Sequence, residues 1–265
     1  MQLSLLYSTP MWIASLLGIV ILFIALEAGF RVGLTRRKKW HDADSGGGAI
    51  VQTSIFALLG LILAFTYATA VNRHDARKYA VLVESNAIST AFQRADLIVE
   101  PGSTELKQVL LDYARTRLFS SDVQQSIETR TAALEKTLEK QSKIWPATKR
   151  VVKQNNPAPM TTSLVAAINS VFDAHTMRLA AAFDTLPKPV MWMLLFITAV
   201  SLSVAGYNAG IQGRMSRWRM AALTLVLTGL MILILDYDRS LDGMITVNQD
   251  DINLVIAEME ASLEQ

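Results

Sequence analysis

Four apolar stretches, each long enough for one crossing of a lipid bilayer, constrain the fold of this chain more than any other feature. A helix rises 1.5 Å per residue, so about 20 apolar residues cover the roughly 30 Å of hydrocarbon. The stretches run from Met11 to Phe30, Ile50 to Val71, Val190 to Gly210 and Met220 to Leu235. Together with a content of 51% hydrophobic residues, they predict an all-α integral membrane protein with four transmembrane helices.

The four stretches divide the chain into four segments. Residues 1–72 are expected to form a first transmembrane hairpin and residues 73–188 a helical extramembrane domain. Residues 189–240 form a second transmembrane hairpin, and residues 241–265 an extended turn followed by an amphipathic helix from Asp250. The N-terminus lacks the basic start and the cleavage site of a signal peptide, so we expect its apolar stretch to be retained.

Within the extramembrane domain, the pattern predicts four helices. Span two continues without proline as far as Pro101, which indicates a single helix of about 50 residues. Ser103 or Thr104 should cap the next helix. The three prolines of residues 146–160 predict a loop, and a last helix runs from Thr161 to Leu186. The helix before that loop is expected to bury the face made of Ile127, Thr131, Leu134, Leu138, Gln141 and Trp145.

Both short connections between paired spans are rich in Lys and Arg. Residues 31–39 contain five basic side chains in nine positions, and residues 214–219 contain three in six. Short basic loops stay in the cytoplasm during membrane insertion. We therefore expect both hairpin turns inside, and both termini and the helical domain outside.

Charged residues are concentrated where spans two and four end. Two crossings separate these ends, so they lie on the same membrane face. The residues are Arg73, Asp75, Arg77, Asp236, Asp238 and Arg239. Because lone charges at this depth are costly, we expect Arg73 or Arg77 to pair with Asp236 or Asp238. The cluster is either a structural clasp or a vestibule that attracts or releases ions.

Further polar residues lie along the helical domain, and we expect them to form pairs that support it. They are Glu84, Asn86, Arg94, Asp96, Asp173 and Arg178. Glu84 and Arg94 are about 15 Å apart along one helix, so each needs a partner on the helix from Thr161 or on a neighbouring subunit. The candidates are Asp173, Arg178 and Asn169.

Two more ionisable residues allow a structural and a functional interpretation. The intramembrane acid Glu27 lies four residues before Arg31, a spacing that favours a local ion pair over a proton relay. His175 falls on an otherwise apolar face, which favours a core histidine over a pH switch.

Small residues recur at helical spacing on two spans. Span two carries Thr53, Ala57, Gly60, Ala64 and Ala68, and span three carries Ala199, Ser203, Gly206 and Gly210. Small residues let helices approach closely in lipid. They indicate packing inside one bundle or packing around an oligomeric pore.

Signatures of enzymes and metal sites are missing from the sequence. The chain has no cysteine, and His41, His74 and His175 share no short metal-binding spacing. It has no phosphate-binding glycine loop after a strand and no nucleophile elbow. We expect no catalysis, no cofactor and no metal.

Four stretches carry a family resemblance that covers nearly the whole chain. They are EAGFRVG at 27–33, LLGLILAFTYATAVNRHDARK at 58–78, ESNAISTAFQRADL at 84–97 and LDYDRSLDGMITVNQ at 235–249. This set resembles the bacterial four-span membrane family called bestrophin-like. The strongest positions of that pattern correspond to Glu27, Gly60, Ala64, Phe65, Arg73, Asp75, Arg77, Glu84, Asn86, Ala87, Arg94, Asp96, Asp236 and Arg239.

The resemblance implies a relation to bestrophins, which are pentameric anion channels with a helical domain between the second and third spans. Bestrophins keep that domain in the cytosol, opposite to the orientation that the basic connections here predict. The leading hypothesis is a multi-pass protein of the cell membrane that acts as an oligomeric anion or ion channel. The alternative is a non-conducting scaffold or sensor whose helical domain binds a protein partner. We expect the lipid bilayer, further copies of the chain and inorganic ions as partners, and no nucleic acid.

Overall fold

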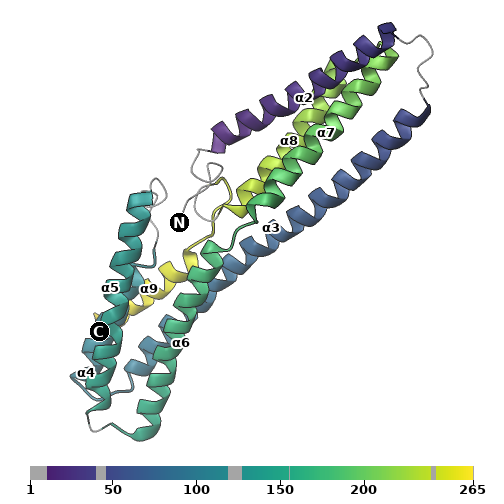
Figure 1. Cartoon of the computed structure of the whole chain (residues 1–265). Helices are drawn as coiled ribbons and strands as arrows, with labels where there is room; N and C mark the ends of the chain where they lie inside the picture. The colour runs from purple at the N-terminus through teal and green to yellow at the C-terminus, as the bar shows by residue number, and fades with distance from the viewer. Residues whose placement is uncertain (1–10, 40–45, 119–126, 155, 240–242, 265) are drawn as a thin grey trace. The chain divides into compact units, whose positions relative to one another are not determined.

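The computed structural model describes residues 11–39, 46–118, 127–154, 156–239 and 243–264, and its secondary structure over these ranges is helical, with no strand (Figure 1). The helices are α2 (Met11–Lys39), α3 (Gly46–Ala95), α4 (Gly102–Arg115), α5 (Ile127–Val152), α6 (Ala158–Phe183), α7 (Lys188–Gln212), α8 (Arg217–Asp238) and α9 (Asp250–Leu263). The prediction of an all-α membrane protein with a helical insert is confirmed.

Four helical stretches in the described residues are long and apolar enough to cross a membrane. They are Trp12–Lys38, Gly48–Ala95, Ala158–Gln212 and Arg217–Asp238. The third contains two helices, and we assign the span to α7 because α6 buries the charged side chain of Arg178. The fourth stretch is α8, which continues through Asp236 to Asp238. Its apolar part is short, and charged residues form the end of the helix.

The chain divides into two units, and α3 contributes to both. The membrane unit contains α2, α3 as far as Arg73, α7 and α8. The helical unit contains α3 from His74, together with α4, α5, α6 and α9. Each unit has its own apolar core.

In the membrane unit, α2 runs alongside α7 (Figure 1). On α2, Gly29 lies against the backbone of Ser203 of α7, and Gly33 lies against that of Gly210. A Cβ built on Gly206 would lie 2.2 Å from the carbonyl oxygen of Leu26. Two glycines four residues apart on each helix therefore let the two backbones touch, which is how small residues drive association in lipid. The small face of span three packs inside one chain.

In the helical unit, the core forms where apolar stripes from five helices meet. The buried residues include Ile88 and Phe92 of α3, Leu106 and Leu110 of α4, Ile144 and Val151 of α5, Leu164 and Ile168 of α6, and Ile252 and Met259 of α9. On the apolar face of α6 that carries His175, Leu164, Ile168 and Val171 are buried, whereas Phe183 is exposed. That helix ends at Phe183, because Asp184 takes an extended conformation before Pro187.

The loop predicted at residues 146–160 is mostly wrong. Helix α5 continues through Pro146 to Val152, and α6 begins at Ala158. A proline inside a helix removes one backbone hydrogen bond and crowds the preceding turn. Here Ile144, Ala147 and Val151 are buried on one face across that proline, so tertiary packing stabilises a helix that its local sequence disfavours.

Two other local predictions are wrong. The buried face of α5 is not the one through Leu138 and Trp145, which are 45% and 37% exposed. The face that packs consists of Thr137, Ile144, Ala147, Thr148 and Val151, all of which are buried. In α4, neither Ser103 nor Thr104 acts as the cap. The carboxylate of Glu100 instead accepts hydrogen bonds from the backbone N–H and hydroxyl of Thr104.

Candidate functional site

The helical unit contains a buried cluster of polar side chains, which we call the Glu84 cluster: Glu84, Tyr113, Arg117, His175 and Arg178. Arg178 donates to Glu84 Oε2 at 2.7 Å, and Arg117 Nε lies 2.8 Å from Oε1. The Tyr113 hydroxyl donates to Oε1 at 2.7 Å. All five side chains are buried, and Glu84 has no exposed surface. The cluster ties α3 to α4 and α6.

His175 takes part in the cluster through one ring nitrogen. Its Nδ1 lies 3.1 Å from the oxygen of Tyr113. Because the phenol gives its single hydrogen to Glu84, the Nδ1–H of His175 must donate to Tyr113. The other ring nitrogen, Nε2, is then a buried acceptor, and no described residue donates to it. His175 is therefore part of a polar network, although it lies on an otherwise apolar helix face.

The charges of the cluster keep Glu84 ionised. Burial alone would raise the pKa of Glu84, but the nearby His175, whose Nδ1 lies 3.7 Å from Oε1, and the positive charges of Arg117 and Arg178 lower it well below the usual value. Burial raises the pKa of Tyr113, and the charge of Glu84 raises it further. Burial and the charge of Arg117 lower the pKa of Arg178, which Glu84 partly restores. Two buried guanidinium groups thus share the carboxylate of Glu84.

The sequence offered Arg178 as a partner of Glu84 but missed Tyr113 and Arg117. The signal was present in the sequence, since Leu106, Leu110, Tyr113 and Arg117 follow one another at three and four residue steps. A charged residue that extends an apolar helical stripe is a candidate for a buried pair.

The other polar residues of the helical domain lie apart from the cluster. Arg94 donates to the backbone oxygen of Ser163 on α6 at 2.8 Å. Asp96 accepts from Lys107 at 2.8 Å. Asn86 and Asp173 are exposed. Of the predicted set, the structure therefore brings only Glu84 and Arg178 together.

In the membrane unit, the two aspartates at the end of α8 bind backbone amides. Asp236 accepts from the N–H of Met244 at 2.8 Å and of Ile245 at 3.0 Å. Asp238 accepts from the N–H of Leu186 at 2.8 Å. Neither carboxylate has exposed surface. Asp236 thus holds the chain that follows α8, and Asp238 holds the chain that precedes α7.

The basic residues that were predicted to pair with these aspartates have different surroundings. Arg77 is buried and donates to the carbonyl oxygens of Ala181 and Asp184, where α6 ends. A cation is favourable there because the last carbonyls of a helix carry partial negative charge. Arg239 is buried, Arg73 is half-buried and Asp75 is exposed. The pairing of Arg73 or Arg77 with Asp236 or Asp238 stays a prediction.

Replacing Asp236 by alanine should release the segment after α8. Two partly buried N–H groups lose their acceptor, at a cost of about 1–3 kcal/mol each. Hydrogen exchange at Met244 and Ile245 should become at least tenfold faster. The exposed Asp75→Ala is the control and should leave these amides unchanged; equal exchange in both variants would contradict the assignment.

Two remaining predictions concern the partner of Glu27 and the metal sites. Arg31 Nε donates to Glu27 Oε1 at 3.0 Å, the local ion pair that the spacing favours. Among the described residues, no group of three or more His, Asp or Glu side chains could hold a metal ion. His41 lies outside the described residues.

The comparison with known families gives a match over most of the chain. A family model described as the Bestrophin-like domain matches residues 21–252. The chain belongs to the Bestrophin-like family. The matched range includes both the Glu84 cluster and the two aspartates, and it extends from within α2 to the first turn of α9. No curated protein and no solved structure matches the chain.

Proposed function

We propose that this Bestrophin-like protein is a multi-pass protein of the cell membrane whose copies assemble into an anion channel. Its family is known for channels rather than enzymes. The main support for this proposal is a face of small residues on α3 that is exposed in the described chain.

That face consists of Thr53, Ala57, Gly60, Ala64 and Ala68, and all five residues are exposed. A Cβ built on Gly60 would meet no atom within 4 Å. On α7, by contrast, Gly206 and Gly210 are in tight contact with α2. The same kind of face is therefore covered on one span and free on another, which supports a second copy of the chain as the partner of α3.

The burial of the aspartates limits their part in conduction. Asp236 and Asp238 have no exposed surface and bind backbone N–H groups. We therefore favour the structural clasp over the ion vestibule for these two residues. Residues that meet ions should be sought among exposed polar groups near this membrane edge, such as Asp75.

The decisive experiment is reconstitution of the purified protein into liposomes with measurement of chloride and potassium flux. We expect chloride flux, and an assembly larger than a dimer in native mass spectrometry. Gly60→Leu should weaken the assembly and reduce the flux at least fivefold. Gly229→Leu is a matched control, because that glycine of α8 also has open space around it.

Absence of flux for both ions, with a monomer or a dimer in solution, would favour the alternative of a scaffold or sensor. The orientation with the basic hairpin turns inside stays a prediction of the positive-inside rule. Because the chain has no cysteine of its own, labelling of single introduced cysteines from each side would check it.

A further inference from the structure

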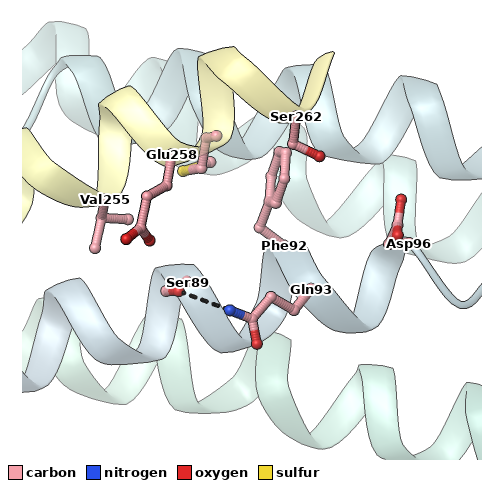
Figure 2. A pocket seen from close by; sticks show the side chains of 8 residues that line it. Ser89, Phe92, Gln93, Asp96, Val255, Glu258 and Ser262 are labelled. Atoms are coloured by element: carbon pink, nitrogen blue, oxygen red, sulfur yellow. Dashed lines mark hydrogen bonds between the residues drawn. The ribbon is translucent and has the colours of Figure 1, made fainter. Parts of the chain in front are cut away.

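A groove runs between α3 and α9 in the helical unit (Figure 2). Its volume is about 210 Å³. Phe92, Val255 and Met259 line its floor, and each is more than nine-tenths buried. Its rim consists of Ser89, Gln93, Asp96, Glu258 and Ser262. The groove therefore combines an apolar floor with a polar rim that includes two carboxylates.

The two carboxylates of the rim differ in their contacts. Asp96 already pairs with Lys107, whose Nζ lies 2.8 Å from Oδ1 and 3.3 Å from the hydroxyl of Ser262. Glu258 is exposed, and no ion pair joins it to another residue of the described chain. In Figure 2 its side chain points from α9 toward Ser89 on α3. One unneutralised negative charge thus lies beside the apolar floor.

The C-terminal segment that forms one side of the groove is acidic, although Arg115 pairs with Glu260 on α9 and Lys107 with Asp96 at the rim. From Ser240 to Gln265 the sequence contains six acidic residues and no Lys or Arg, while the whole chain has a net charge of +2. On α9, Asp250, Asp251 and Glu258 are exposed, and Leu254 between them is 62% exposed. This outer face extends along a helix of 14 residues, or about 21 Å.

We propose that this groove binds a Lys or Arg side chain from a basic segment of a partner protein, with α9 as the docking helix. The aliphatic stem lies on Phe92 and Met259, and the cationic head meets Glu258 at the rim. Long basic side chains bury their stem on apolar surface while the charge stays near water. Further basic residues of the segment meet Asp250 and Asp251.

The volume and the charge of the groove favour a basic segment of a protein as the partner. The groove is smaller than the roughly 300–1,000 Å³ of pockets for drug-sized ligands, so it suits one side chain. The acidic face of α9 extends well beyond the groove, so it suits a chain segment rather than a single amine. Nucleic acid and anionic lipid headgroups carry the same sign of charge as α9 and are repelled. The inference does not depend on ion conduction.

The test uses the full-length protein in nanodiscs of phosphatidylcholine and a fluorescent peptide made of Lys, Ala and Ser. Fluorescence anisotropy should show binding of this peptide, and at least tenfold weaker binding of a peptide with Gln in place of every Lys. Glu258→Gln should weaken binding about fivefold, near the upper end for an exposed ion pair. Ser89→Phe, which fills the groove without changing charge, should weaken it at least tenfold.

Glu135→Gln is the matched control, because it removes an exposed acid from α5 and should leave binding unchanged. Equal binding of the Lys and Gln peptides, or equal binding to empty nanodiscs, would overturn the proposal. Loss of affinity in Glu258→Gln without any loss in Ser89→Phe would show general attraction to α9 and would overturn the groove as the site.

Discussion

Replacing Glu84 by alanine is expected to lower the free energy of unfolding of the helical unit by about 3–5 kcal/mol. The substitution leaves two buried guanidinium groups, Arg117 and Arg178, without the carboxylate that neutralises them. Removing one partner of a buried ion pair has a cost of this size because the other charge stays buried. Trp145 is the only tryptophan of this unit, so its fluorescence during urea unfolding reports the effect once the other tryptophans are replaced by phenylalanine.

Two further variants make this prediction specific. Glu139→Ala removes an exposed carboxylate that pairs with Lys143 one turn away, and it should have a much smaller effect. Replacing Glu84, Arg117 and Arg178 together by Met, Met and Leu should recover most of the lost stability, since apolar side chains can replace buried ion pairs. If Glu84→Ala is no more destabilising than Glu139→Ala, the cluster does not stabilise the unit.

The same cluster predicts a dependence on pH. The folded state lowers the pKa of Glu84, so this group stabilises the protein above the pKa of an unfolded glutamate, about 4.3. That contribution is lost as the pH falls below this value toward the lower folded pKa. The stability difference between wild type and Glu84→Gln should therefore be constant from pH 7 to pH 5 and shrink between pH 4 and pH 3. A difference that does not change over this range would contradict the assignment.

Replacing Gly206 by leucine is expected to separate α2 from α7 and to destabilise the membrane unit strongly. Even a methyl group at this position would lie 2.2 Å from the backbone oxygen of Leu26 and 3.0 Å from the backbone nitrogen of Phe30. Overpacking typically costs about 1–3 kcal/mol, and a backbone cannot move aside as a flexible side chain can. SDS titration followed by circular dichroism should show loss of the folded state at a much lower SDS fraction.

Gly229→Leu provides the control for this experiment, because it adds the same side chain to α8 where no atom lies within 4 Å. It should unfold at nearly the same SDS fraction as the wild type. Equal destabilisation by both substitutions would mean that leucine at any glycine of a span is harmful, and that contact between α2 and α7 is not the cause.

Features that depend on local pattern were predicted well. The four spans follow from apolar length, and the helix of 50 residues, α3, follows from the absence of proline as far as Pro101. The terminal helix α9 begins at Asp250, as its pattern indicates. Each of these features is encoded by residues adjacent in the chain or one helical turn apart, so it needs no knowledge of distant contacts.

Features that depend on contacts between distant residues required the structure. Packing carries α5 through Pro146, although proline predicts a break. The aspartates that end α8 bind the backbone amides of Leu186, Met244 and Ile245, and an amide donor has no signature in the sequence. The small residues of α7 were visible as a pattern, but nothing in that pattern says that they pack against α2. The sequence by itself determined that the chain is helical and that some of its helices are long and apolar enough to span a membrane, because these features follow from periodicity and apolar length. The tertiary structure decided which faces and charges meet, because that depends on residues far apart in the chain.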